Sequence, residues 1–310
     1  MTTWFGVRPV WIAGPLLLYA AAVAMLYSEG EMGVAEAGFV LLVMGVGLPL
    51  LAYALTTKAS RGRPVRAPIA PNEMVAVLGY VALFAVFVLG FGFTLLNSAV
   101  STEPAQTVAK TVAKLVTMVL LPVLLLRHFG RTRADWLKPW FSLRLHVPAL
   151  LGVGAALMLI QILLGRGLQT LSELHPDPST LAWAIPACFA WMSIEAGLCE
   201  EVLFRAFLQD RLAAWFEAEA PALLWGALLF GLAHAPGLYL RGAAQMEGVT
   251  EATISWAISY SVVMIAPVGL AFGVLWARTR NLWLLVALHG LTDTLPNLAS
   301  FVAALRPANF

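Results

Sequence analysis

Residues 181–212 read LAWAIPACFAWMSIEAGLCEEVLFRAFLQDRL. This apolar run exceeds the roughly 20 residues that a helix needs to cross the hydrocarbon core of a bilayer. Its middle nevertheless carries four ionisable side chains, which are Glu195, Glu200, Glu201 and Arg205. An ionisable group at membrane depth is costly unless it is paired, so each of these residues is a candidate functional residue.

Further apolar runs of spanning length flank this one on both sides. The nine candidate spans cover residues 9–28, 34–57, 74–97, 107–126, 147–165, 181–212, 220–236, 252–277 and 281–303. The chain is 60% hydrophobic and only 12% charged, whereas a soluble domain carries about 25% charged residues. A water-soluble domain, a disordered chain and a disulfide scaffold are therefore excluded. We predict an all-α, polytopic transmembrane helix bundle of about nine spans, with eight as the alternative count.

The basic residues fall mainly on one side of the predicted membrane. Only Arg166, Arg241 and Arg306 lie on the other side, while Lys110, Lys114 and Arg205 lie within spans. Short cytoplasmic loops are enriched in Lys and Arg, which predicts a cytoplasmic N-terminus. Thirteen of the 19 basic residues are then cytoplasmic: Arg8, Lys58, Arg61, Arg63, Arg66, Arg127, Arg131, Arg133, Lys138, Arg144, Arg211, Arg278 and Arg280.

This distribution also bears on location and partners. The basic residues form short clusters between apolar runs and no continuous patch, so no nucleic-acid partner is predicted. The composition favours an integral protein of a bacterial inner membrane. Lys110 and Lys114 lie near the outer end of the fourth span, and we expect their side chains to extend outward to the membrane surface.

The last four spans hold a second group of ionisable residues at compatible depths. His234 lies in the seventh span, and His289 and Asp293 lie in the ninth. At 1.5 Å per residue, Glu200 and His234 are both about 20 Å along their helices from the turn at 213–219. His289 is about 13 Å from the same side of the membrane. These depths favour a common polar site.

The two adjacent glutamates have different predicted roles. Glu201 precedes Arg205 by four residues, the spacing at which an ion pair closes along one helix face. Glu200 is rotated by about 100° from Glu201 and is left over, which makes it a candidate general base. In the structural alternative, Glu200 is a second partner for Arg205 or bonds to a nearby carbonyl. Glu195 has no assigned role, and a lysine or a water elsewhere in the bundle is its candidate partner.

Three short motifs occur in order on separate predicted helices. EEVLFR at 200–205 matches EExxxR, FGLAH at 230–234 matches FxxxH, and HGLTD at 289–293 matches Hxxx(N/D). Together they resemble the motifs of the CAAX-protease and bacteriocin-processing family (CPBP, or Abi) of intramembrane endopeptidases, which includes the Ras- and a-factor-converting enzyme. The resemblance covers residues 183–303.

The resemblance implies a peptidase in which a glutamate and a histidine activate water. Glu200 and His234 would polarise the water that attacks a peptide carbonyl, and His289 with Asp293 would face the developing oxyanion. Supporting residues would be Glu201, Arg205 and Phe230. Asp293 departs from the family pattern, which has Asn, and an ionised carboxylate cannot donate to an oxyanion. We expect Asp293 instead to accept a hydrogen bond from His289 and to orient its ring.

The resemblance also divides the chain. We expect residues 1–180 to form five N-terminal transmembrane helices without a recognised motif, 181–303 to form the catalytic core, and 304–310 to form a short tail. No cofactor is predicted, and HExxH is absent, although two histidines with two glutamates leave metal dependence open. The predicted partners are the lipid bilayer and a membrane-associated protein or peptide substrate, whose identity and lipidation the sequence does not specify. The alternative is a non-catalytic membrane protein on the same scaffold, such as an immunity or assembly factor.

Overall fold

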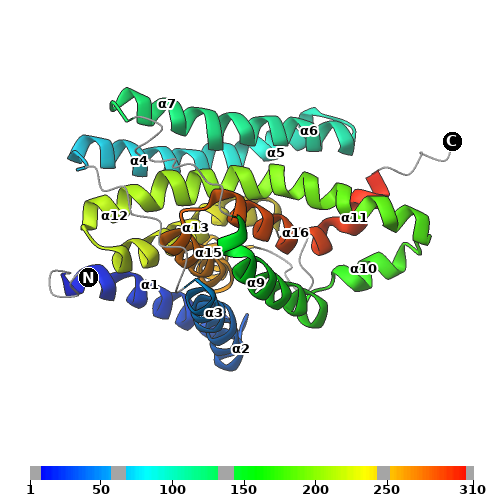
Figure 1. The fold of residues 1–310 in the computed structure, drawn as a ribbon, viewed down its shortest axis with the longest axis horizontal. Coiled ribbons are helices and arrows are strands. Elements are labelled where there is room, and N and C mark those ends of the chain that lie inside the picture. The colour runs from blue at the N-terminus through cyan, green and yellow to red at the C-terminus, as the bar shows by residue number, and fades with distance from the viewer. Residues whose placement is uncertain (1–7, 57–67, 132–142, 243–251, 305–310) are drawn as a thin grey trace.

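The computed structural model describes residues 8–56, 68–131, 143–242 and 252–304, and all regular structure in these ranges is helical (Figure 1). The α-helices are α1 (Pro9–Ser28), α2 (Val34–Val40), α3 (Leu48–Leu55), α4 (Pro71–Leu83), α5 (Phe93–Ala99), α6 (Glu103–Lys114), α7 (Leu121–His128), α9 (Leu143–Leu164), α10 (Gly167–Glu173), α11 (Pro178–Met192), α12 (Asp210–Phe216), α13 (Glu219–Gly237), α14 (Ile254–Tyr260), α15 (Ala266–Thr279) and α16 (Leu282–Ala304). The predicted tail beyond residue 304 lies outside the described residues. The all-α class is confirmed.

Several of these α-helices are joined end to end by π-helical segments. These segments are η2 (Leu41–Gly47), η3 (Phe84–Gly92), η4 (Leu115–Leu120), η5 (Ser193–Leu198), η6 (Glu201–Gln209), η7 (Leu238–Gly242) and η9 (Ser261–Ile265). In a π-helix the backbone bonds join residues five apart, so residues at that spacing lie on one face. The wider turns therefore change which side chains share a face in the long sixth span.

Within the described ranges, eight helices are long and apolar enough to cross a membrane. They are Pro9–Ser28, Val34–Leu55, Pro71–Ala99, Pro104–His128, His146–Leu164, Pro178–Phe216, Glu219–Gly242 and Ile254–Thr279. The predicted ninth span is helical as α16 but is not one of the eight, because polar residues such as His289, Asp293 and Asn297 lower its hydropathy. The count is thus the alternative count of eight, with α16 as an additional, more polar helix.

Local sequence fixes where the helices of the core begin and end. Pro178 occupies the first turn of α11, and the Asp177 carboxylate caps it by accepting the N–H of Thr180 at 2.9 Å. The Ser179 hydroxyl and this N–H donate to Asp177 and hold its pKa below the usual range. At the other end, α12 stops at Glu217, which takes the left-handed conformation with φ 52°.

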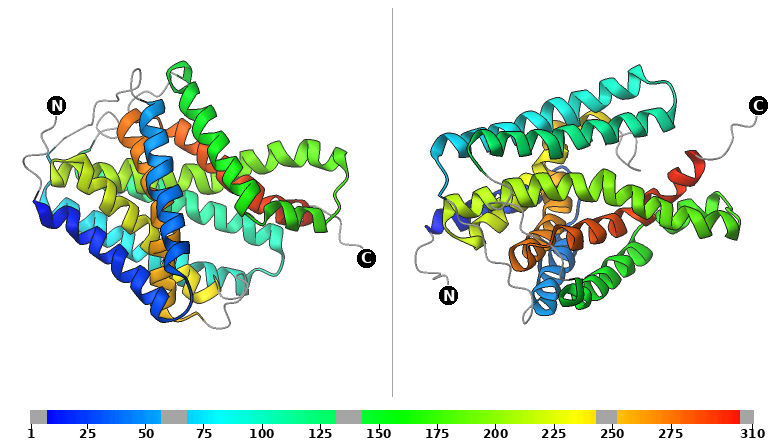
Figure 2. Two further views of the ribbon diagram at one scale, coloured as in Figure 1. Left: turned by 90° about the horizontal axis from the view of Figure 1, so that it is seen from below. Right: turned by 45° about the horizontal axis from the view of Figure 1, so that its top comes forward.

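The helices of the last four spans lie in the middle of the molecule. In Figure 1 the antiparallel hairpin of α4–α5 and α6–α7 lies above them, and α1, α3 and α9 lie below. Figure 2 shows the same hairpin running beside the long α11–α12 helix. Within that long helix, η6 contacts both α4 and η4 of the hairpin. The five N-terminal spans therefore cover the core from two sides.

One apolar core joins the two parts of the chain. Its buried residues include Val77 and Met118 from the N-terminal spans and Phe204, Phe272 and Leu288 from the last four. Large apolar side chains on the outer helix faces are exposed, among them Leu17, Leu50, Val75, Leu95 and Leu163. Such faces suit contact with lipid.

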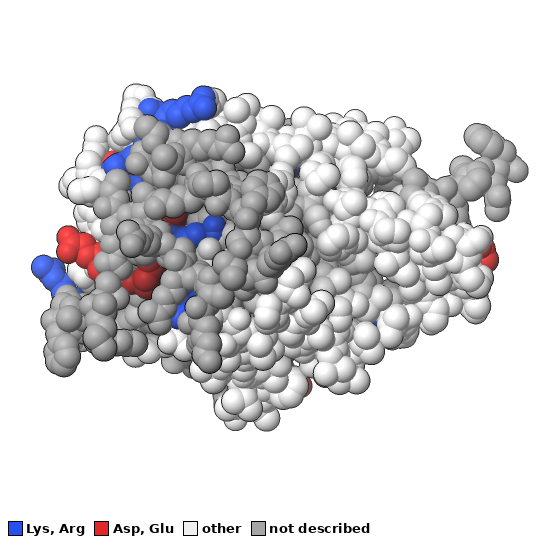
Figure 3. Space-filling model, in the orientation of Figure 1, with Lys and Arg blue, Asp and Glu red and all other residues white. Residues whose placement is uncertain are grey.

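Charged residues gather at one end of the bundle, which we call the charged end; it comprises Glu73, Arg131, Asp210, Arg211, Glu219 and Arg280. Glu73 is buried and accepts from Arg131 at 2.5 Å and from Arg211 at 3.3 Å. Arg280 pairs with Asp210 and, at 2.9 Å, with Glu219. In Figure 3 the visible charges concentrate at the left, while most of the remaining described surface is uncharged. The structure thus brings together the loop ends that the sequence assigns to one side of the membrane.

Candidate active site

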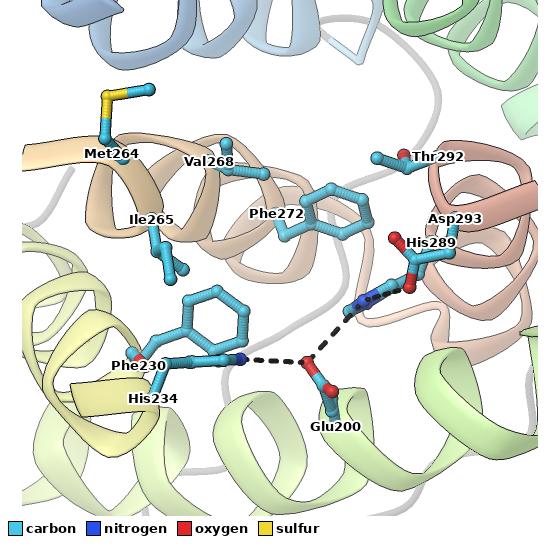
Figure 4. Close-up of a pocket in the computed structure, with 10 residues that line it drawn as sticks. All are labelled: Glu200, Phe230, His234, Met264, Ile265, Val268, Phe272, His289, Thr292 and Asp293. Atoms are coloured by element: carbon cyan, nitrogen blue, oxygen red, sulfur yellow. Dashed lines mark hydrogen bonds and ion pairs between the residues drawn. The ribbon is translucent and has the colours of Figure 1, made fainter. Parts of the chain in front are cut away.

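Glu200 lies on the continuous helix Pro178–Phe216, at the junction between η5 and η6. Its Oε2 atom is 3.6 Å from Nε2 of His289 and 4.0 Å from Nε2 of His234 (Figure 4). The three side chains come from three different helices, η5–η6, α13 and α16. The structure therefore brings together the residues whose depths suggested a common site.

His234 is oriented by its own helix. Nδ1 lies 2.8 Å from the carbonyl oxygen of Phe230, one turn earlier, and a carbonyl only accepts, so Nδ1 carries the hydrogen. In the neutral ring, the Nε2 lone pair then faces Glu200. The Phe230 ring packs edge-on against His234 with centroids 4.9 Å apart and lies 4.8 Å from the Arg205 guanidinium. Phe230 therefore supports His234 through both its ring and its carbonyl.

His289 is held from the opposite side by Glu201. Nδ1 of His289 lies 2.8 Å from Oε1 of Glu201, so this nitrogen donates to the carboxylate. Asp293 is more distant, with Oδ2 at 3.5 Å from Nε2. This differs from the expectation that Asp293 orients the ring. Glu201 from η6 reaches the inner nitrogen, and Asp293, one turn along α16, approaches the nitrogen that faces Glu200.

Glu201 also forms the ion pair with Arg205 that the sequence predicts. Its Oε2 lies 3.0 Å from Nε of Arg205, and the two side chains are at most 1% exposed. The atoms are close without the alignment of a hydrogen bond, so the contact is mainly electrostatic. Each oxygen of Glu201 thus has its own partner, and Glu201 and Glu200 approach opposite nitrogens of the His289 ring.

A cavity of about 220 Å³ adjoins these groups. Its polar wall consists of Glu200, His234, His289, Thr292 and Asp293, and its apolar wall consists of Phe230, Met264, Ile265, Val268 and Phe272 (Figure 4). The volume is several times the space of one water molecule. It can hold a water together with part of a larger molecule.

Comparison with protein-family models matches the segment that contains this cavity. Residues 182–295 match the model described as type II CAAX prenyl endopeptidase Rce1-like. The match supports the resemblance of this segment to the CPBP family. Glu200, His234, His289 and Asp293 all lie within it. No match to the chain was found among curated proteins or among solved structures.

The CPBP family is a family of CAAX-protease-like membrane endopeptidases. The matched segment covers a little over a third of the 310 residues and excludes the first five spans. Those spans still contribute a charged residue to the candidate site. Lys114, at the end of α6, places Nζ 2.6 Å from Oε1 of Glu195 and 3.8 Å from Oε1 of Glu200.

The expectation for Lys114 was wrong, because its side chain points into the bundle and is only 12% exposed. Two features of the fold explain this. The α4–α7 hairpin packs against η6, and η5 is π-helical, which puts Glu195 and Glu200 on one face although α-helical spacing separates them by about 140°. The lysine partner suggested for Glu195 is confirmed. The sequence did offer a signal for this pair, because Lys114 and Glu195 both lie within predicted spans and Glu195 had no assigned partner.

The remaining cavity residues gave no signal in the sequence. Met264, Ile265, Val268 and Phe272 are apolar residues in an apolar span, where such residues ordinarily pack against lipid or other helices. In the described part of the chain, no three His, Cys, Asp or Glu side chains are arranged to hold a metal ion.

Proposed function

We propose that this protein is an intramembrane endopeptidase that hydrolyses a peptide bond in a membrane-associated protein or peptide, using water activated by Glu200 and His234. One observation carries the proposal: a single oxygen of Glu200 faces Nε2 of both His234 and His289 at the wall of the cavity. A carboxylate and a neutral imidazole that both accept hydrogen bonds from one water molecule are suited to general base catalysis.

In the proposed reaction, the water lies between Glu200 and His234. It donates one hydrogen bond to each, and Glu200 takes its proton as the water oxygen attacks the carbonyl carbon. The carbonyl oxygen becomes an oxyanion and accepts a hydrogen bond from Nε2–H of His289. Glu200 then returns the proton to the peptide nitrogen as the C–N bond breaks, which leaves a carboxylic acid and a free amine, and the acid loses its remaining proton to water on release.

His289 must carry hydrogen on both ring nitrogens in this scheme. Nδ1–H donates to Glu201, and Nε2–H is then available to the oxyanion. Carboxylate oxygens of Glu200, Glu201 and Asp293 all lie within 3.6 Å of the ring nitrogens and stabilise its positive charge. A charged donor of fixed direction is an effective stabiliser of an oxyanion.

The substrate is proposed at the level of class. The matched family model is named for CAAX prenyl endopeptidases, so a prenylated C-terminal peptide is one candidate, and an unmodified apolar segment is another. The apolar wall formed by Met264, Ile265, Val268 and Phe272 suits either. We place the protein in a bacterial inner membrane with a cytoplasmic N-terminus.

The test compares the cleaved termini of membrane proteins in cells that produce wild-type protein, Glu200→Gln or Glu173→Gln. Glu173 is an exposed glutamate at the end of α10, so its variant controls for the chemical change. We expect a set of termini that is present with wild type and Glu173→Gln and absent with Glu200→Gln. Identical termini in all three strains would contradict the proposal and favour a non-catalytic immunity or assembly factor.

A peptide identified in this way serves as substrate for the purified protein. Synthetic versions with and without a prenyl group separate the two substrate candidates. Incubation with a chelator followed by addition of Zn²⁺ tests metal dependence. If the chelator abolished cleavage and Zn²⁺ restored it, the metal-free scheme would be wrong and the reaction would depend on a bound metal.

A further inference from the structure

Glu200 has neighbours on both of its carboxylate oxygens. Oε2 faces the two histidines, and Figure 4 shows the second oxygen pointing away from them. That second oxygen, Oε1, lies 3.8 Å from Nζ of Lys114. The lysine and the glutamate are 12% and 13% exposed, so little water separates the two charges.

Glu195 fixes the position of the lysine. The Nζ to Oε1 distance of 2.6 Å between Lys114 and Glu195 is that of a charge-assisted hydrogen bond, whereas the contact to Glu200 is longer and ionic. Glu195 and Glu200 approach the ammonium from one face because η5 is π-helical. The ammonium is therefore anchored by one carboxylate and acts on the other.

We propose that Lys114 is a positioning residue for Glu200: anchored by Glu195, its ammonium holds the Glu200 carboxylate ionised and turned toward His234 and His289. The proposal rests on the proposed role of Glu200 as the base. A base must be unprotonated before it can act, and a neighbouring positive charge favours that form. The consequence is that the N-terminal spans complete a site whose motifs all lie in the matched segment.

The lysine acts among several other charges. In the described part of the chain, the titratable and charged groups that face Glu200 are Lys114 from α6, Glu195 from η5, Arg205 from η6, His234 from α13, and His289 and Asp293 from α16. Arg205 is already paired with Glu201, and the histidines are part of the reaction itself. Among the described residues, Lys114 is thus the permanent cation that contacts Glu200 and takes no part in the reaction itself.

The first test reads the protonation of Glu200 without any substrate. A hydrophobic carbodiimide modifies protonated carboxyl groups in membranes, and mass spectrometry of the peptide that contains Glu200 measures the rate. At neutral pH we expect slow modification of wild type, modification about tenfold faster or more in Lys114→Met, and the slow rate again in Lys114→Arg. Modification of Lys114→Met at the wild-type rate would overturn the proposal.

Arg241→Met is the matched control, because it also removes a positively charged side chain from a contact between helices. Arg241 donates to the carbonyl of Gly90 at 2.7 Å and to Thr94 at 3.1 Å, and it has no contact with Glu200 among the described residues. We expect wild-type modification of Glu200 in this variant. Faster modification in both variants would mean that loosening of the bundle, and not the Lys114 charge, exposes Glu200, and would overturn the proposal.

The second test uses the peptide substrate. Lys114→Met should lower kcat about a hundredfold with KM nearly unchanged, as expected for misplaced catalytic groups, and should move the acid limb of the pH profile to higher pH. Lys114→Arg should restore much of kcat. Glu195→Gln keeps the lysine but removes its anchor, so it should also lower kcat, and it provides a test if Lys114→Met does not accumulate.

The outcomes separate the two proposals. Activity of Glu200→Gln equal to wild type would refute the proposed function itself. An inactive Glu200→Gln together with wild-type kinetics for Lys114→Met, or for Glu195→Gln, would refute only the role of Lys114.

Discussion

The carboxylate of Glu201 joins two functional elements, because Oε1 lies 2.8 Å from Nδ1 of His289 and Oε2 lies 3.0 Å from Nε of Arg205. It links η6 to α16 and neutralises a guanidinium that is 1% exposed. A carboxylate on one ring nitrogen fixes the orientation of an imidazole and leaves the other nitrogen for the reaction. Glu201 therefore sets the direction of His289 as well as the charge balance of the buried Arg205.

This arrangement predicts that substitution of Glu201 lowers stability, whereas substitution of Glu200 lowers activity. Glu201→Gln should destabilise the protein by about 3–5 kcal/mol, because it leaves Arg205 buried without its partner. Glu200→Gln should leave yield and unfolding unchanged and abolish turnover, since the amide keeps the shape but cannot take a proton. Thermal unfolding in detergent and the cleavage assay measure the two effects. Equal loss of stability in both variants would contradict this division.

Asp293 gives a second prediction. Its carboxylate lines the cavity 3.5 Å from Nε2 of His289, on the side where the oxyanion would form. Asp293→Asn should retain a substantial part of the activity, because the amide can donate to the oxyanion. Asp293→Ala should lose about a hundredfold, the usual effect of removing an element of an oxyanion site. Wild-type activity of Asp293→Ala in the reconstituted assay would assign Asp293 to packing only.

The sequence predicted the polar site through positions and spacings that do not depend on side-chain packing. Depth along the helices was enough to suggest that Glu200, His234 and His289 could meet, and four-residue spacing was enough for Glu201 and Arg205. The contacts between helices were not accessible in this way. The bond from His289 to Glu201 joins residues 88 positions apart, and nothing in either motif distinguishes it from a bond to the nearer Asp293.

The error for Lys114 has a specific physical origin. Angular positions derived from α-helical geometry assume about 100° per residue, but Ser193–Leu198 is π-helical. A lysine near the end of a predicted span ordinarily extends to the interface. Only the packing of the α4–α7 hairpin against the core turns its side chain inward. The first span, in contrast, was predicted with the bounds observed, Pro9–Ser28, because a proline begins it and polar residues follow it.

Gly290 allows the close approach of α16 to η5 next to His289. A Cβ atom at this position would lie 2.1 Å from Oγ and 2.8 Å from Cα of Ser193. Gly290→Ala should therefore push the helices apart, lower stability by about 1–3 kcal/mol and reduce activity by displacing His289. Gly79→Ala in α4 is the matched control, since no atom lies within 4 Å of its Cβ. Unfolding at the same temperature in the two variants would contradict the packing argument.

The orientation in the membrane is the last prediction. The charged end gathers the start of α4, the segment after α7, the α12–α13 turn and the start of α16, all of which the basic-residue count assigns to the cytoplasm. Gly62→Cys and Thr132→Cys should therefore resist a membrane-impermeant maleimide in intact cells and react after lysis, whereas Glu173→Cys should react in intact cells. Both native cysteines are buried, so the background should be low. Labelling of positions 62 and 132 but not 173 in intact cells would reverse the orientation and place the charged end outside.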